Sequence, residues 1–185
     1  MNSEPRCILT AGDIQRALDR MGAEILERNR GIRDLALVGI RTRGEFLAQR
    51  LQQSIAFHAV TGSGEGGKVP VGVLDTTIHR DDYDPLRGEV QIHRTEIAFE
   101  VEGLHLILVD DVLWTGRTVR AGMTGVMSFG RPSRISLAVL VDREGRELPI
   151  SADFYGREVS TAPDERVKVL LQEVDDRDEV QVIRN

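Results

Sequence analysis

The sequence predicts an α/β fold in one domain, with a mostly parallel, twisted sheet flanked by helices. Short apolar runs at residues 35–40, 104–109 and 135–141 have the length and branching of strands that are covered on both faces. Segments with helical periodicity separate these runs, and that alternation is typical of a parallel sheet. The 185 residues correspond to one ordinary domain.

The first helix is predicted over residues 11–29. Thr10 and Asp13 have the spacing of a capping box, and apolar residues follow at helical intervals. We expect Gly31 to close this helix as its C-terminal cap. The strand at 35–40 comes next and leads through a turn into a second helix, predicted over residues 45–53.

The middle of the chain is rich in glycine and charge. Residues 61–67 predict an exposed loop, and 69–77 resume strand character. Residues 79–88 carry many charges and Pro85, which indicates a mobile segment before a hairpin-like region at 90–101.

Beyond the strand at 104–109, a third helix is predicted over residues 119–129. Gly122 and Gly125 allow it to pack closely on the sheet, and Gly130 followed by Pro132 ends it. The strand at 135–141 is followed by a polar excursion over residues 142–149.

Composition excludes several classes of function. The formal net charge of −6 gives no overall attraction for nucleic acid, so any RNA binding must use a local basic patch. The single Cys7 cannot form an internal disulfide, and the N-terminal residues lack the pattern of a secretory signal, so we expect a cytoplasmic protein. No apolar run approaches the roughly 20 residues that span a bilayer, so no membrane partner is expected.

Residues 106–118 are the most informative segment. A buried strand ends in Asp110 and Asp111, and Thr115-Gly116-Arg117-Thr118 follow at the start of a helix. Backbone N–H groups at such a helix start favour an anion, and the carboxyl end of a parallel strand is a ligand position. The acids would repel that anion, so we expect them to reach sugar hydroxyls, and the predicted ligand is a sugar phosphate. An ordinary strand ending in a solvated turn would explain the acids alone, without the adjoining loop.

A second polar turn, Arg41-Thr42-Arg43-Gly44, follows the strand at 35–40. Arginine forks match phosphate oxygens, and a glycine lets the backbone approach them. Taken alone, this turn is more typical of two solvated arginines at a helix start.

The segment 106–118 resembles the phosphoribosyl pyrophosphate (PRPP) motif of the type I phosphoribosyltransferases. In that family the acidic pair holds the ribose 2′ and 3′ hydroxyls, and the Thr-Gly-Arg-Thr loop cradles the 5′-phosphate. The resemblance implies a PRPP- and UMP-binding set of Asp110, Asp111, Val112, Leu113, Thr115, Gly116, Arg117 and Thr118.

The resemblance extends to two further loops and to a cofactor. It implies a pyrophosphate loop made of Arg41, Thr42 and Arg43, and a flexible loop at about 78–90, with His79 and Arg80, that closes over PRPP. As bare sequence, the segment at 78–90 is more typical of a solvated charge run. Mg²⁺ is implied by the polyphosphate substrate, and no metal-ligand cluster is expected from the protein alone.

Residues 40–44, 118–123 and 140–150 resemble a subgroup, the bacterial pyrimidine-operon attenuation regulators that are also uracil phosphoribosyltransferases. The resemblance runs from about residue 8 to residue 182. It implies conversion of uracil and PRPP to UMP and pyrophosphate, binding of pyrimidine-operon mRNA when UMP or UTP is bound, and a homodimer or higher homo-oligomer. The base would lie beneath a small hood, residues 142–160, near Val141, Asp142 and Arg143, which would otherwise indicate a polar surface loop.

The implied RNA-binding residues are Arg20, Arg28, Arg157 and Thr161. Asp19 and Ala23 depart from the subgroup, whose attenuating members tend to carry a hydroxyl residue and a histidine there. Attenuation would then be weakened, changed in its target, or replaced by another mode of mRNA control.

Three questions stay open on the sequence. A phosphoribosyltransferase for purines without an RNA role and a nucleotide sensor with little catalysis are the alternative functions. Trp114 packs beside the sugar or fills a gap. No general base for uracil is evident.

Overall fold

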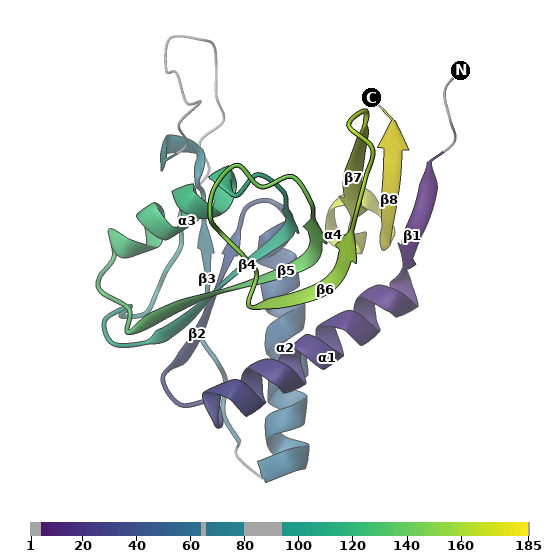
Figure 1. Ribbon diagram of the computed structural model, residues 1–185. Helices are drawn as coiled ribbons and strands as arrows, with labels where there is room; N and C mark the ends of the chain where they lie inside the picture. Colours follow the sequence, from purple (N-terminus) through teal and green to yellow (C-terminus); the bar gives the residue numbers. More distant parts are fainter. Residues whose placement is uncertain (1–4, 64–65, 80–93, 185) are drawn as a thin grey trace.

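The computed structural model describes residues 5–63, 66–79 and 94–184, and Figure 1 shows their arrangement. Within these residues a five-stranded sheet has the order β3-β2-β4-β5-β6, and every neighbouring pair in it is parallel. Its strands are β2 (Leu35–Ile40), β3 (Val71–Leu74), β4 (His105–Leu113), β5 (Arg134–Arg143) and β6 (Phe154–Val159). The predicted fold class is therefore confirmed.

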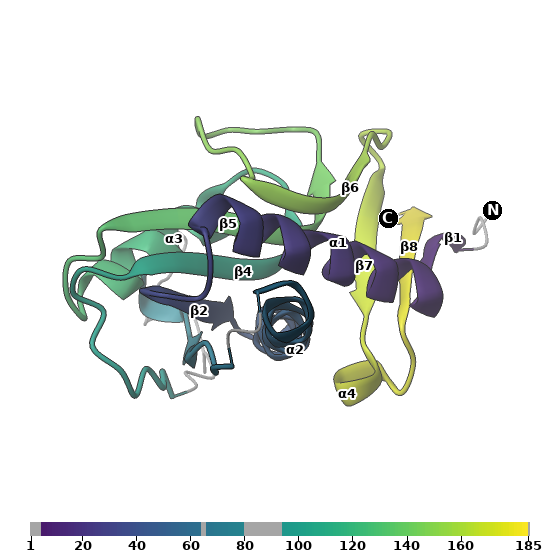
Figure 2. The same ribbon diagram turned by 90° about the horizontal axis from the view of Figure 1, so that it is seen from below.

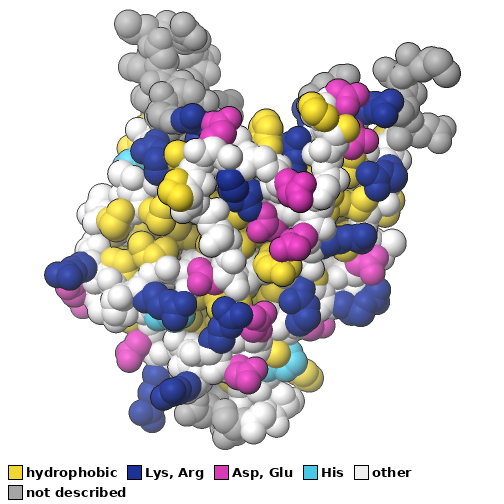
Figure 3. All heavy atoms as spheres, viewed as in Figure 1, with side chains coloured by type: hydrophobic (Ala, Val, Ile, Leu, Met, Phe, Trp, Pro, Cys, Tyr) yellow, Lys and Arg dark blue, Asp and Glu magenta, His cyan; other side chains and the backbone are white. Residues whose placement is uncertain are grey.

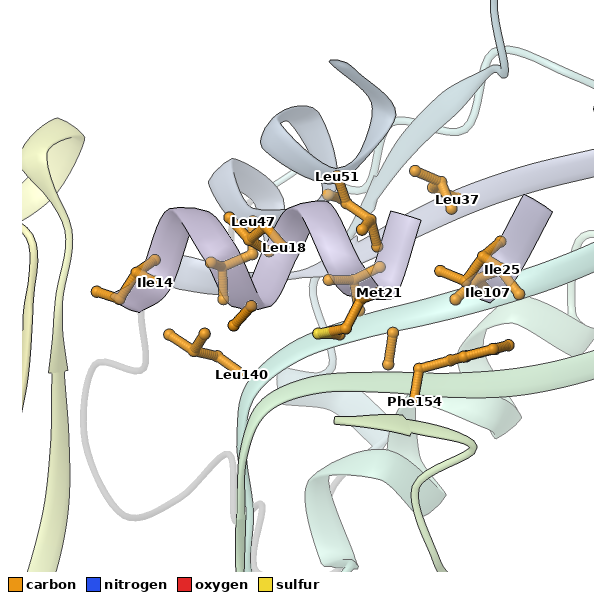
Figure 4. Close-up of a cluster of buried hydrophobic side chains, with 14 of the residues drawn as sticks. Ile14, Leu18, Met21, Ile25, Leu37, Leu47, Leu51, Ile107, Leu140 and Phe154 are labelled. Carbon is orange, nitrogen blue, oxygen red and sulfur yellow. The ribbon is translucent and has the colours of Figure 1, made fainter. Parts of the chain in front are cut away.

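Helices cover both faces of this sheet. On one face α1 (Ala11–Asn29) and α2 (Arg43–Ser63) pack on residues such as Leu37 and Ile107, as Figure 4 shows. On the other face α3 (Arg117–Met127) packs on Val38 and Leu108, the next residues along the same two strands. Side chains alternate between the faces of a strand, so strands buried on both sides consist almost entirely of apolar residues.

A second, three-stranded antiparallel sheet lies beyond β6, as Figures 1 and 2 show. It consists of β1 (Arg6–Thr10), β8 (Glu179–Arg184) and β7 (Glu165–Leu170), and a short α4 (Gln172–Asp175) connects the last two in the chain. Leu9, Val169 and Val180 from these strands join the core beneath α1. None of the strands β1, β6, β7 and β8 was predicted from the sequence.

The predicted helix boundaries are partly right. The Thr10–Asp13 capping box is present, and α1 ends at the predicted Asn29. The left-handed cap is Arg30 rather than Gly31, although Gly31 also has a positive φ. α2 runs to Ser63 rather than to residue 53, so the predicted loop at 61–67 begins inside a helix.

The later predictions also need adjustment. β3 is confined to Val71–Leu74, and Thr77–His79 form a short 3₁₀ helix, η1, where strand was predicted. α3 begins two residues earlier than predicted and ends at Met127. Most of the predicted flexible loop and the start of the hairpin-like region, residues 80–93, lie outside the described residues; beyond them, Glu96 forms an isolated antiparallel bridge with Val73. None of the helices in the described part of the chain has the length and apolar character needed to cross a membrane.

Candidate active site

The acidic pair lies inside β4 rather than in a turn after it. Asp110 is 6% exposed, and its carboxylate accepts a hydrogen bond from the Asp111 N–H at 2.9 Å. The Asp111 carboxylate accepts from the Val112 N–H at 2.8 Å. These bonds fix both side chains at the carboxyl end of the central strand of the sheet.

Burial raises the pKa of both carboxyl groups. For Asp110 the nearby charge of Asp111 adds to burial, and the pKa lies well above its ordinary value. For Asp111 burial also raises the pKa, although the Val112 N–H and the positive charge of Arg43 act in the opposite direction. The fold therefore holds two carboxylates where ionisation is unfavourable, which is typical of functional sites.

The loop after β4 turns sharply into α3. Gly116 has φ of 91° and occupies the N-cap position, where no side chain caps the helix. Gly116 itself offers no side chain to the N–H groups that follow, and Thr115 Oγ1 accepts from the Arg117 N–H at 3.4 Å. Arg117 lies outside the turn, and its Nε donates to the Glu147 carboxylate at 2.7 Å.

A cavity of about 350 Å³ opens beside this loop. It is lined by Asp111, Val112, Leu113, Trp114, Thr115, Gly116, Thr118, Val119, Arg143, Arg166 and Val167. The motif thus supplies most of the wall. Arg166 and Val167 come from β7, and sequence analysis missed both because nothing in their local pattern distinguishes them from an ordinary edge strand.

The segment after β5 crosses over the motif and is fastened to it. Arg146 Nη1 donates to the carbonyl oxygens of Leu113 at 3.2 Å and Trp114 at 2.5 Å, and Nη2 pairs with the Asp142 carboxylate. The N–H groups of Glu147 and Leu148 both donate to the Thr115 carbonyl, at 3.0 and 3.1 Å. The three predicted base-site residues therefore separate: Arg143 lines the cavity, Asp142 is engaged by Arg146, and Val141 is fully buried in the core.

Trp114 forms one wall of the cavity and is held by the hood. The Arg143 guanidinium stacks over its indole, 4.3 Å from the ring centroid. Arg143 in turn donates to Thr161 Oγ1 and to the Glu165 carbonyl, both at 2.8 Å. A side chain at Gly145 would collide with the indole nitrogen, so glycine is required where the hood passes Trp114.

The second predicted loop meets the motif across two glycines. A Cβ on Gly44 would overlap the carbonyl oxygen of Val109, and one on Gly39 would overlap that of Gly44. The peptide between Arg41 and Thr42 is cis. Arg41 pairs with Glu45 at 3.2 Å, and Arg43 pairs with Asp175 of α4 at 2.9 Å. Both predicted phosphate-binding loops therefore lie at the carboxyl edge of neighbouring strands.

Of the predicted flexible-loop residues, only His79 can be placed. It ends η1, its carbonyl accepts a hydrogen bond from Arg120 of α3 at 3.1 Å, and Gly125 leaves room for its ring. Arg80 lies outside the described residues.

The predicted RNA-binding arginines lie along α1 and β6. Arg20 donates to the carbonyl oxygens of Tyr155 and Gly156 at 2.8 and 2.9 Å, and Arg28 donates to that of Asp153 at 3.3 Å. Arg157 donates to the Ile8 carbonyl at 2.6 Å. Thr161 lies apart from them, against Arg143 at the cavity.

The two departing positions lie beside α2. The Asp19 side chain accepts from Gln15 at 3.0 Å, while its carbonyl oxygen lies 3.1 Å from Nε2 of His58 in α2. Ala23 and His58 line one shallow groove. Figure 3 shows cationic and anionic side chains interspersed on the face crossed by α1. The described residues contain no group of three or more His, Cys, Asp or Glu side chains that could hold a metal ion.

Comparison with known proteins agrees with this geometry. The family model described as the phosphoribosyl transferase domain matches residues 8–169, so fold and site define a phosphoribosyltransferase. A hypoxanthine phosphoribosyltransferase from Staphylococcus aureus superposes with a TM-score of 0.68 at 21% identity, covering 97% of this chain and 92% of its own, which shows the fold alone.

Relatives in sequence are more specific. Bifunctional protein PyrR from Roseiflexus sp. (strain RS-1) is 52% identical over 169 residues, which cover 91% of this chain and 88% of the relative. Bifunctional protein PyrR from Chloroflexus aurantiacus is 51% identical over 178 residues, covering 96% and 94%. The chain belongs to the PyrR family, which confirms the resemblance predicted from the sequence.

Proposed function

We propose that the chain transfers the ribosyl phosphate of PRPP to uracil, yielding UMP and pyrophosphate, and that it binds pyrimidine-operon mRNA under the control of UMP or UTP. Membership of the PyrR family supports both activities. The structural observation that carries the enzymatic half is the buried Asp110–Asp111 pair beside the Gly116 helix start and the cavity.

In this proposal the two loops, residues 41–43 and 110–118, bind different parts of PRPP. Asp110 and Asp111 accept hydrogen bonds from the ribose hydroxyls, and the backbone of residues 115–118 binds the 5′-phosphate. Val112 and Leu113 form the adjoining wall of the cavity. Arg41, Thr42 and Arg43 bind the pyrophosphate group, and His79 and Arg80 belong to the loop that covers it.

The base site of the proposal differs from the one expected from sequence. Arg143, Arg166, Val167 and Trp114 line the cavity, whereas Val141 and Asp142 do not, so we assign the base to the first group. Asp111 is the carboxylate among the described residues that line the cavity. Because it is assigned to the ribose hydroxyls, no residue is assigned as a general base for uracil. Ribosyl transfer through a positively charged sugar needs charge stabilisation and orientation more than proton abstraction.

Mg²⁺ enters the proposal with the substrate. The ion supplies charge neutralisation for the departing pyrophosphate, and oxygens of PRPP and water satisfy most of its coordination. The chain contributes oxygen donors in the adjacent carboxylates of Asp110 and Asp111, whose pKa is raised by burial and, for Asp110, by the neighbouring charge of Asp111. That environment fits a bound cation nearby.

The proposed RNA surface consists of Arg20, Arg28 and Arg157 along α1 and β6; Thr161, which the resemblance groups with them, lies apart against Arg143. The arginine side chains of α1 remain about half exposed, at 53% for Arg20 and 50% for Arg28, so their outer N–H groups are accessible to phosphate. We further propose a cytoplasmic homo-oligomer, a dimer or higher, as the PyrR resemblance implies.

Base choice tests the enzymatic half. With PRPP and Mg²⁺, uracil is expected to be converted to UMP, while hypoxanthine, guanine, adenine and orotate are poor substrates. Faster conversion of any purine would overturn the uracil assignment and leave the PRPP site intact. Tight UMP binding without turnover would instead make the chain a nucleotide sensor.

A further inference from the structure

We infer that Asp175, in the C-terminal α4, is a positioning residue that orients the Arg43 guanidinium toward the pyrophosphate group. The inference rests on the proposed function, because it takes Arg43 as part of the pyrophosphate loop. It adds a functional residue from a segment to which sequence analysis assigned no role.

The contact between the two side chains uses one edge of the guanidinium. Arg43 Nε donates to Asp175 Oδ2 at 3.2 Å, and Nη2 donates to Oδ1 at 2.9 Å and to Oδ2 at 3.0 Å. Such a bidentate ion pair fixes the plane of the guanidinium as well as its position. Among the hydrogen bonds that Arg43 makes to described residues none involves Nη1, so two N–H groups remain for an anion.

The carboxylate of Asp175 is itself held rigidly. Its Oδ2 accepts from the Leu171 N–H at 3.0 Å, and its own N–H donates to the Leu171 carbonyl at 2.7 Å. Leu171 is completely buried in the core cluster beneath α1. Burial acts to raise the pKa of Asp175, but the hydrogen bonds from Arg43 and the Leu171 N–H outweigh it and hold the pKa below its ordinary value, so the side chain is ionised at neutral pH.

The positioned guanidinium lies near the acidic pair. Its positive charge partly offsets the burial that raises the pKa of Asp111, one of the two carboxylates proposed to hold the ribose. Gly44, the residue after Arg43, packs so closely on the Val109 carbonyl that an added Cβ would overlap it. Val109 directly precedes the acidic pair. Arg43 therefore lies between α4 and the carboxyl end of β4.

A second arginine on the same helix supplies the contrast. Arg50 lies seven residues beyond Arg43, about two helical turns, and pairs with Glu173 at 2.6 Å and Asp178 at 2.8 Å. All three of its guanidinium nitrogens donate to these carboxylates, so Arg50 is a clamp between α2 and the α4 turn that leaves no nitrogen without a partner. Arg43 also pairs with a carboxylate, but its Nη1 donates no hydrogen bond to a described residue.

The test compares Asp175→Asn with Asp178→Asn, which removes a carboxylate from the clamp instead. Initial rates give KM for PRPP, KM for uracil and kcat, and calorimetry gives the affinity for pyrophosphate with Mg²⁺ independently of turnover. For Asp175→Asn we expect KM for PRPP and Kd for pyrophosphate to rise at least about fivefold, with KM for uracil changed less than about twofold. Asp175→Glu is expected to recover part of the loss.

The control is expected to behave differently. Asp178→Asn lowers the midpoint of thermal unfolding but leaves KM for PRPP and Kd for pyrophosphate within about twofold of wild type. The inference is overturned if Asp175→Asn leaves pyrophosphate binding unchanged or tightens it, since Asp175 would then be idle or a competitor. It is also overturned if both variants weaken binding equally, because Asp175 would then act only by anchoring α4. Failure of the wild-type chain to convert uracil would contradict the proposed function alone, and the pyrophosphate titrations would still decide the role of Asp175.

Discussion

Two regions differ in how their charged side chains are held: the carboxyl edge of the five-stranded sheet and the surface along α1 and β6. At the sheet edge, Asp110 and Asp111 are buried side by side, and no described arginine or lysine forms an ion pair with them. Along α1 and β6, Arg20, Arg28 and Arg157 donate to backbone carbonyl oxygens of other elements. The carboxylates of the first region accept hydrogen bonds from neighbouring backbone N–H groups, whereas the arginines of the second tie separate elements together.

This difference separates two kinds of evidence for function. A buried carboxylate with a raised pKa costs stability, and folds retain such groups chiefly where chemistry requires them. A half-exposed arginine that ties two elements together explains itself structurally, and an RNA role would be additional. The buried acidic pair therefore supports a functional role directly, whereas the contacts of the arginines are also explained by structure alone.

The largest expected effect is from Gly44→Ala, which tests how closely the two loops must approach. The added Cβ would overlap the Val109 carbonyl, so α2 or β4 must shift. We expect a loss of about 1–3 kcal/mol in unfolding free energy, as for other overpacking changes, together with severe loss of PRPP binding. Gly62→Ala in the same helix is the matched control: it has open space, and alanine there should leave stability equal or higher. Equal tolerance of both changes would mean that the loops need not touch.

Asp110→Asn and Asp111→Asn separate function from stability at the sheet edge. Each change is expected to reduce uracil phosphoribosyl transfer at least about tenfold, or roughly 1.4 kcal/mol in the transition state. Because the folded-state pKa of Asp110 is raised, its ionised form destabilises the fold as pH rises through that pKa. Asp110→Asn should therefore raise the unfolding free energy at pH 7, and the gain should shrink as pH falls.

Paired rate and denaturant measurements check these two variants. The exposed Asp164, which pairs loosely with Arg184, gives the control: Asp164→Asn should change neither quantity. Wild-type rates in both motif variants would show that these carboxylates do not hold the ribose.

Arg20→Ala and Arg20→Lys test whether Arg20 on α1 contributes to RNA affinity as well as to stability. Alanine removes two hydrogen bonds to β6 and should cost about 0.5–1.5 kcal/mol in unfolding free energy. Lysine keeps the charge without the two-carbonyl contact, so it should lose stability but retain most RNA affinity if RNA phosphates read that charge. RNA affinity that follows stability in both variants would assign Arg20 a structural role only.

The smallest expected effect concerns His105, at the opposite end of β4 from the acidic pair. Its ring nitrogens lie 2.8 Å from Asn29 Oδ1 and 3.1 Å from Ser136 Oγ. Burial lowers its pKa, Arg134 adds to that effect, and Asp153 opposes it. The neutral ring contributes stability that is present above about pH 6.5 and is lost as pH falls through the lowered pKa. Denaturant melts between pH 7 and 5 should show a shallower decline for His105→Gln, and parallel profiles would contradict the assignment.

The sequence predicted what depends on neighbouring residues. The apolar runs of β2, β4 and β5, the Thr10 capping box and the order of acids and loop in the motif are all local patterns. The end of α2 was missed because the polar Ser54 interrupts its apolar face; it is buried against α1, donating to the Leu18 carbonyl at 3.3 Å. Side-chain packing between helices decides that position, and periodicity alone does not show it.

The missed parts of the site depend on contacts across the chain. Arg166 and Val167 reach the cavity through an antiparallel sheet that joins the two ends of the molecule. Asp175 meets Arg43 across 132 positions in sequence. The alternating pattern of β7 predicts at most an exposed strand, and only the fold shows what that strand faces.

Binding of the organism's own pyrimidine-operon leader RNA at physiological salt, with and without UMP, tests the central claim that one chain links a nucleotide site to an RNA surface. We predict that leader RNA binds more tightly than a scrambled RNA, that UMP strengthens this binding, and that the RNA tightens UMP binding by the same factor, as linkage requires. Because the net charge is −6, binding through local arginines should also weaken steeply with added salt. Equal binding of leader and scrambled RNA, with or without UMP, would contradict the regulatory half and leave a uracil phosphoribosyltransferase.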